Sequence, residues 1–200
     1  MYGEIDAGLP PVNTLVYGHS WNRDMTEQLS ADDWINQGLK ALAKSGFTAL
    51  KADPLAKAMG VSRGSFYWHF ADLGAFHAAV LKRWREIAAE QIIADVEADR
   101  DEPLKALLRG TFGARLDLER AVRNWAAFDP AAQVAVRAID RRRLDYIETL
   151  LERRGLNATM AQARAQILYW TFLGFALSSA PVPAPRLLGL LDEILRMVSA

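Results

Sequence analysis

The segment from residue 62 to residue 69 carries the side chains most able to contact another molecule. Arg63 can donate two hydrogen bonds to a guanine edge or bind phosphate, whereas Ser65 and Tyr67 can donate to phosphate oxygens. Consecutive large rings cannot all face inward on a helix, so part of this aromatic run must be exposed. The sequence therefore predicts a DNA-contacting surface made of Ser62, Arg63, Gly64, Ser65, Tyr67, Trp68 and His69, with Thr48 and Lys51 beside it.

Two short helices joined by a tight turn are expected to position this surface. Asp53 is predicted to cap the first helix and Pro54 to occupy its first position. Gly60 falls where the chain must reverse, which favours a left-handed conformation. Ser62 is predicted to cap a second helix over residues 62–69, with its inner face made by Phe66 and Phe70. This pattern is typical of a helix-turn-helix that binds the DNA major groove.

These residues resemble the DNA-binding domain of the TetR/AcrR family of bacterial repressors. The resemblance covers about 50 residues and rests on Gly46-Phe47, Leu55-Ala56, Gly60-Val61-Ser62, Gly64, Tyr67 and His69-Phe70. It implies an all-α homodimer with a small-molecule pocket in its C-terminal domain. Two departures concern phosphate contacts: Leu73-Gly74 stands where many members have a lysine, and Lys51 where many have a threonine.

About nine helices are expected, in an all-α fold with no strand. Residues 1–29 are predicted to be a flexible tail, residues 30–75 a helix-turn-helix domain, and residues 76–200 a ligand-binding and dimerisation domain. A long fourth helix at about 73–98 would link the two domains. The remaining helices are expected at 31–44, from Leu104 to Phe112, at 116–127, at 130–154, from a capping box of Thr159 and Gln162, and at 186–198.

An internal pocket is predicted between the C-terminal helices. Its candidates are the large or hydrogen-bonding residues Phe112, Arg115, Trp125, Phe128, Tyr146, Tyr169 and Trp170, which would favour an apolar effector. Taken singly, each of them fits a plain core position better than a ligand contact. The run from Asp140 to Arg143 is interpreted as a solvated helix face with local ion pairs such as Asp140–Arg143.

A dimer interface is predicted on the last two helices. Apolar residues cover nearly the whole circumference at 167–177, and a helix that is apolar all round must be buried on all sides. Two such helices and their symmetry mates would form a four-helix interface. The alternative is a helix central to one protomer. The interface candidates are Ile167, Phe172, Phe175, Leu187, Leu191, Ile194 and Leu195.

Composition narrows the classes of function. The formal net charge is +0 at pH 7, so DNA binding must depend on a local basic patch. The absence of cysteine is compatible with a reducing cytoplasm, where we expect the protein to act. The longest apolar run is too short to span a membrane, so no membrane partner is expected. His19, His69 and His77 show no metal or catalytic spacing, so neither an enzyme nor a cofactor is expected.

The leading hypothesis is a homodimeric repressor that binds a palindromic operator in double-stranded DNA and is released by an unidentified small, mainly apolar effector. The alternative is a DNA-binding protein that takes no small molecule and recruits a protein partner. Ligand-induced stabilisation by apolar compounds would distinguish the two.

Overall fold

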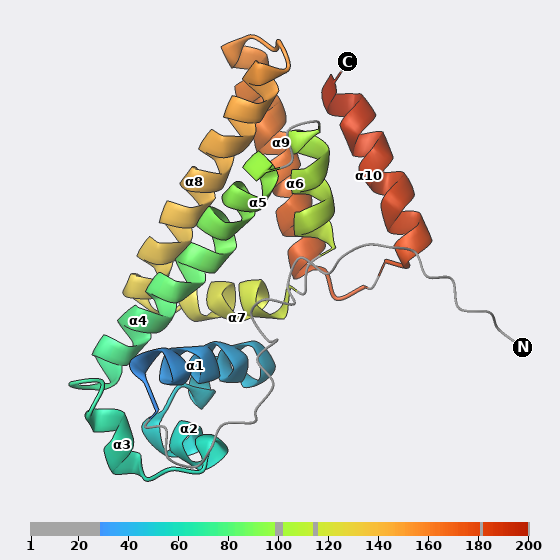
Figure 1. The fold of residues 1–200 in the computed structure, drawn as a ribbon. Helices are drawn as coiled ribbons and strands as arrows, with labels where there is room; N and C mark the ends of the chain where they lie inside the picture. Colours follow the sequence, from blue (N-terminus) through green and yellow to red (C-terminus); the bar gives the residue numbers. More distant parts are fainter. Residues whose placement is uncertain (1–28, 99–101, 114–115, 181, 200) are drawn as a thin grey trace, which may run out of the picture.

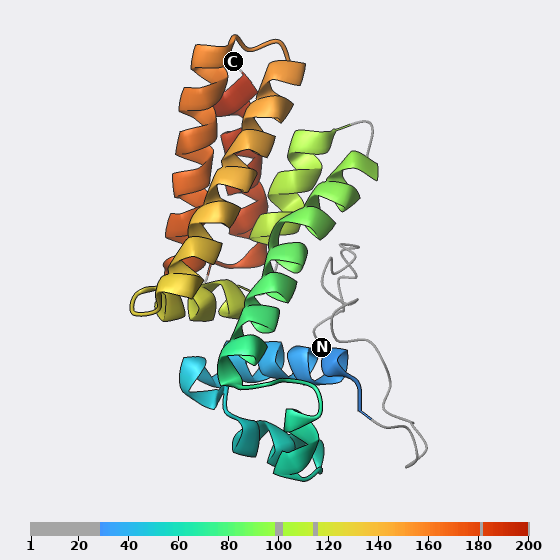
Figure 2. The ribbon, with the colours of Figure 1, turned by 90° about the vertical axis from the view of Figure 1, so that its left-hand side faces the viewer.

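The computed structural model describes residues 29–98, 102–113, 116–180 and 182–199 (Figures 1 and 2). Nearly all of the tail predicted at 1–29, and the pocket candidate Arg115, lie outside these residues. The described elements are α1 (Ala31–Ser45), the 3₁₀ turn η2 (Phe47–Ala49), α2 (Ala52–Met59), α3 (Arg63–Tyr67), α4 (Leu73–Arg85), the π-helical stretch η3 (Glu86–Gln91), α5 (Ile92–Ala98), α6 (Pro103–Phe112), α7 (Asp117–Ala126), α8 (Pro130–Arg153), α9 (Ala158–Leu177) and α10 (Ala184–Ser199).

The all-α prediction is confirmed. Because α4, η3 and α5 follow one another without a break, the described part of the chain contains nine helical rods and no strand. Figure 1 shows α1, α2 and α3 at one end of the molecule, with α4 rising from them towards the body formed by α6, α8, α9 and α10. The helix α7 lies across the junction, packed along α1.

Side-chain caps fix where several helices begin. Ser30 and Asp33 form a reciprocal capping box at α1, and Asp72 and Asp129 accept backbone N–H groups at the starts of α4 and α8. Gly60 has the predicted left-handed conformation, with φ 69° and ψ 26°.

Two predicted caps are wrong and a third makes no side-chain bond. The residue preceding α2 is Lys51, so Asp53 lies in the first turn, where its carboxylate pairs with Arg63 at 3.5 Å. The helix α9 is capped by Asn157, whose Oδ1 accepts from the Met160 N–H, and not by Thr159. Ser62 precedes α3 as predicted but its side chain makes no capping hydrogen bond, and α3 ends at Tyr67 rather than at residue 69.

The buried apolar residues form two clusters. The first joins the core of α1–α4 to α7 and the N-terminal half of α8, so the α1–α3 end shares its core with the body. The second lies between α5, α6, α8, α9 and α10. His77 packs in the first cluster: its Nε2 lies 2.9 Å from the Leu50 carbonyl and its ring contacts Phe47 and Trp125. The contact between the α1–α3 end and the body is therefore made by packed rings and aliphatic side chains.

No described helix combines the length and apolarity needed to cross a bilayer.

The crossing of α1 and α4 requires a residue without a side chain. A Cβ built on Gly38 would lie 2.7 Å from Cζ of Phe76, a ring that is fully buried and cannot turn aside. We expect Gly38→Ala to lower the free energy of unfolding by about 1–3 kcal/mol, because overpacking outweighs the gain in helix propensity. The matched control is Gly110→Ala in α6, where nothing lies within 4 Å of the added Cβ. Urea unfolding should show the control unchanged or stabilised; equal behaviour of both variants would refute this account.

Candidate nucleic-acid interface and internal pocket

Most of the predicted contact residues belong to the end of the molecule formed by α2 and α3 (Figure 1): the seven from Ser62 to His69 lie in or beside α3, and Lys51 directly precedes α2. Trp68 is 83% exposed although it follows a helix whose inner face is fully buried. The half-buried members are Ser65 and His69; the exposed members are Thr48, Lys51, Ser62, Arg63, Gly64, Tyr67 and Trp68. Eight of the nine predicted residues therefore lie in or next to α2 and α3, whereas Thr48 lies in η2 and lines an open cleft beside α7.

Phe66 holds α3 in place. Its ring is fully buried and contacts the rings of Trp34, Phe70 and Phe76 with centroid separations of 5.2–5.3 Å, mostly edge to face. Arg63, Gly64 and Tyr67, on the same helix, are exposed. The five-residue helix is thus oriented by one aromatic side chain.

Arg63 is held by its own chain in this structure. Its Nη2 donates to the Tyr67 hydroxyl at 3.2 Å, and its Nε lies 3.5 Å from Asp53 Oδ1. Both members of the ion pair are largely exposed, so the pair contributes little to stability. A phosphate or guanine edge could therefore replace these partners at small cost, which makes Arg63 available to a nucleic acid.

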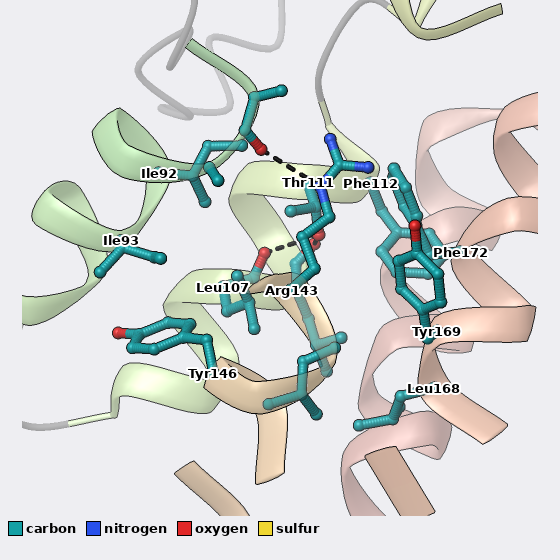
Figure 3. Close-up of a pocket in the computed structure, with 14 residues that line it drawn as sticks. Ile92, Ile93, Leu107, Thr111, Phe112, Arg143, Tyr146, Leu168, Tyr169 and Phe172 are labelled. Atoms are coloured by element: carbon teal, nitrogen blue, oxygen red, sulfur yellow. Dashed lines mark hydrogen bonds between the residues drawn. The ribbon is translucent and has the colours of Figure 1, made fainter. Parts of the chain in front are cut away.

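A small cavity lies in the body, between η3, α5, α6, α8 and α9. Its free volume is about 50 Å³, room for a few water molecules. Figure 3 shows Arg143 extending from α8 between Ile92 and Ile93 of α5 on one side and Tyr169 and Phe172 of α9 on the other. The lining is Ala88, Ala89, Ile92, Ile93, Leu107, Leu108, Thr111, Phe112, Arg143, Tyr146, Ile147, Leu168, Tyr169 and Phe172.

Three of the predicted pocket residues line this cavity, namely Phe112, Tyr146 and Tyr169. Trp125 and Phe128 instead line an open cleft near the junction with α1, where both rings face Phe47. Trp170 is 64% exposed on the outer face of α9. Residue size thus selected three side chains that line the cavity but could not separate inner from outer faces.

The interpretation of residues 140–143 as a solvated face is wrong for Asp140 and Arg143. Arg143 is only 14% exposed, and its Nη1 and Nη2 donate to the two oxygens of Glu119 at 3.0 and 2.9 Å. Its Nε donates to the Ala88 carbonyl in η3 at 3.2 Å. Arg143 follows the buried Ile139 and precedes the buried Ile147 by one helical repeat each, so apolar spacing could have placed it inward.

A second arginine completes a buried network behind the pocket. Arg123 of α7 donates to Glu119 at 2.7 Å and to Asp140 at 2.6 Å. The Tyr169 hydroxyl donates to Asp140 at 2.5 Å and accepts from Arg123 at 2.9 Å. Two arginines thus face two carboxylates, and the network links α7, α8 and α9 without net charge.

Burial and charge act in opposite directions on these groups. Burial by itself raises the pKa of Glu119, but the charges of Arg143 and Arg123 and their hydrogen bonds outweigh it, so the pKa lies below its ordinary value. Burial raises the pKa of Tyr169 to about 12, although the two arginines oppose that shift. Glu119 is therefore ionised and Tyr169 protonated at neutral pH.

The predicted dimer residues divide into two groups. Ile167 is exposed on α9, whereas Phe172 and Leu191 are buried inside the chain itself. The others are partly buried against the second core, namely Phe175, Leu187, Ile194 and Leu195. The exposed apolar residues of α9 form a stripe of Met160, Ile167, Trp170 and Leu177.

Gly64 provides a test of the nucleic-acid interface. It has no positive φ, and a Cβ there would meet only Ser62 Oγ at 3.7 Å, so Gly64→Ala should fold normally and gain about 0.5 kcal/mol from helix propensity. If the α3 backbone approaches DNA closely, the added methyl group should weaken operator binding about tenfold, measured by fluorescence anisotropy. Gly110→Ala should leave binding unchanged. Unaltered affinity of Gly64→Ala would show that α3 does not dock through this face.

The buried network predicts that the stability of the fold depends on pH in the acidic range. Because the pKa of Glu119 is below 4.5 in the folded chain, its ionised form stabilises the fold near neutral pH, and this contribution is lost as pH falls below about 4.5. We expect Glu119→Gln to lower the free energy of unfolding by about 3 kcal/mol near pH 7, and by progressively less as the pH falls. The control, Glu90→Gln, removes an exposed pair with Arg142 and should cost under about 1 kcal/mol. If the difference in free energy of unfolding between wild type and Glu119→Gln did not shrink as the pH falls, this account would be contradicted.

Comparison with known proteins supports the reading of the α1–α3 end. Residues 35–73 match the family model described as bacterial regulatory proteins, tetR family. No curated protein sequence gives a significant match.

Solved structures share the fold over most of the chain. A TetR-family transcriptional regulator from Rhodococcus sp. superimposes with a TM-score of 0.62 at 16% identity, covering 85% of this chain and 98% of that one. The fatty acid degradation regulator FadR from Bacillus halodurans gives a TM-score of 0.61 at 15% identity, covering 85% of this chain and 94% of that one. The match at residues 35–73 therefore identifies a DNA-binding domain of the tetR family of bacterial regulatory proteins, and most of the chain shares its fold with TetR-family regulators.

Proposed function

We propose that this regulator is a homodimeric repressor that a small, mainly apolar molecule releases from a palindromic operator. The observation that carries the proposal is the continuous rod formed by α4, η3 and α5. Its first residues follow the DNA-binding helices, and its far part contributes Ala88, Ala89, Ile92 and Ile93 to the wall of the pocket. A change in the pocket is therefore applied directly to the helix that carries the DNA-binding end.

The π-helical stretch gives this rod a site of deformation. A π-helix widens the turn and is less favourable than α-helix, and such stretches often occur at functional sites. Here it covers residues 86–91, where Ala88 and Ala89 line the pocket and Ala88 accepts from Arg143. The free volume of about 50 Å³ is too small for a drug-sized molecule, so an effector must move the pocket walls. The wall formed by η3 is the one connected to α4.

Dimerisation supports operator recognition. The stripe on α9 leaves a contiguous apolar face uncovered, including Trp170 at 64% exposure. A second copy packed on this stripe across a two-fold axis would bury it with self-complementary contacts. Two α3 helices spaced by about 34–36 Å would then reach successive major grooves of a palindrome. Effector binding would change this spacing through α4 and release the DNA.

A substitution in the stripe tests the dimer and the operator together. Trp170→Glu should convert the dimer to a monomer in analytical ultracentrifugation, because a charge would have to be buried at the interface. In footprinting of the DNA upstream of the gene, wild-type protein should protect a palindrome and Trp170→Glu should not.

The matched control is Val134→Glu, which places the same charge on α8, at a side chain that is 61% exposed and outside the stripe. It should remain dimeric and protect the palindrome. A monomeric wild-type protein, or a dimeric Trp170→Glu, would overturn the proposed interface. Absence of any protected site near the gene would overturn repression from an adjacent operator.

A second candidate function is a DNA-binding regulator that takes no small molecule and recruits a protein partner. The small free volume of the pocket favours it. In that case apolar compounds would neither stabilise the protein nor change operator binding.

A further inference from the structure

Every polar side chain that lines the pocket is already bonded to the protein. Thr111 Oγ1 donates to the Leu107 carbonyl at 2.7 Å, and the Tyr146 hydroxyl donates to Glu97 at 2.9 Å. The Tyr169 hydroxyl donates to Asp140, as described above. The remaining lining residues are apolar, apart from Arg143.

Arg143 is the charged residue of the lining, and its charge is neutralised from behind. Both of its terminal nitrogens donate to Glu119, which is 6% exposed and does not itself line the pocket. Its Nε donates to the Ala88 carbonyl. The guanidinium stacks near the Phe172 ring, with Cζ 5.2 Å from the ring centroid, so its accessible face is partly covered as well.

We propose that the pocket selects uncharged effectors over carboxylates, and that Glu119 sets this preference by neutralising Arg143. The inference rests on the proposed effector pocket and adds the chemical class of its ligand. Glu119 touches no ligand in this account; it is a specificity-determining residue that acts through Arg143.

The balance of charge explains the selectivity. The network holds Arg123 and Arg143 against Glu119 and Asp140, so a bound carboxylate would add a third negative charge to two positive charges. It would also lose its hydration at a site where three of the five Arg143 N–H donors are already bonded to Glu119 and Ala88, a cost that paired partners normally offset. An uncharged apolar molecule avoids both penalties and gains from contact with the aliphatic and aromatic lining.

A matched pair of probes tests the inference: 1-octanol and octanoate, which differ in the head group. At about pH 8 the acid is ionised. Isothermal titration calorimetry of the full chain should show octanol binding at least about tenfold more tightly than octanoate. Equal or tighter binding of octanoate would overturn the inference while leaving the effector pocket in place. If neither probe binds although operator DNA does, the pocket itself fails as an effector site, and the inference fails with it.

Substitution of Glu119 tests the assigned residue. In Glu119→Gln, Arg143 loses its counter-charge, so the octanol-to-octanoate affinity ratio should move about tenfold or more towards octanoate. The control Glu90→Gln removes an exposed carboxylate that pairs with Arg142 and should leave the ratio unchanged. Circular dichroism at the titration temperature verifies folding, and the wild-type ratio tests the selectivity independently of the variant. An unchanged ratio in folded Glu119→Gln would refute the role of Glu119.

Discussion

The architecture depends on one constraint: a single helical rod, from Leu73 to Ala98, is packed at both of its ends. At the DNA-binding end, Phe76 lies against Gly38 and contacts Phe66, the residue that orients α3. At the other end, the rod forms a wall of the pocket. Because packed interiors change between discrete arrangements rather than deform smoothly, the proposed coupling needs a displacement at one end of such a rod to be transmitted to the other.

The buried network gives the pocket end its stiffness. It joins α7, α8 and α9 through Glu119, Arg123, Asp140, Arg143 and Tyr169, and Arg143 extends it to the π-helical stretch. Since α7 also packs along α1, the network reaches the DNA-binding end by a second route besides the rod. A buried ionic network contributes less to stability than its contacts suggest, because desolvation opposes it. Its value here is in fixing the relative positions of four elements around a small apolar cavity.

Much of this fold follows from local sequence patterns, because caps and turns are local. The starts of α1, α4 and α8 were predictable from a side-chain acceptor before an apolar repeat, and the reversal at Gly60 from the need for a positive φ. Asp53 misled the prediction because its carboxylate has a tertiary partner, Arg63. The π-helical stretch contains neither proline nor glycine and has no local indication.

The pocket was harder to predict because its polar contacts join distant parts of the chain. The partner of Arg143 lies 24 residues away on another helix, so local pairing rules gave Asp140 in its place. Size alone selected Phe112, Tyr146 and Tyr169, which line the cavity, but could not show that Trp170 faces outward. The direction in which an aromatic side chain of α9 points is decided by tertiary packing, because that helix is apolar on nearly every face.

The central claim is that the pocket and the DNA-binding end are coupled through the rod. Thermodynamic linkage makes this measurable in one experiment: the affinity of 1-octanol for the free protein and for the operator-bound protein, determined by calorimetry under identical conditions. The account predicts that operator DNA weakens octanol binding about tenfold, and that saturating octanol weakens operator binding by the same factor. Equal affinity of octanol for the free and operator-bound protein would contradict it.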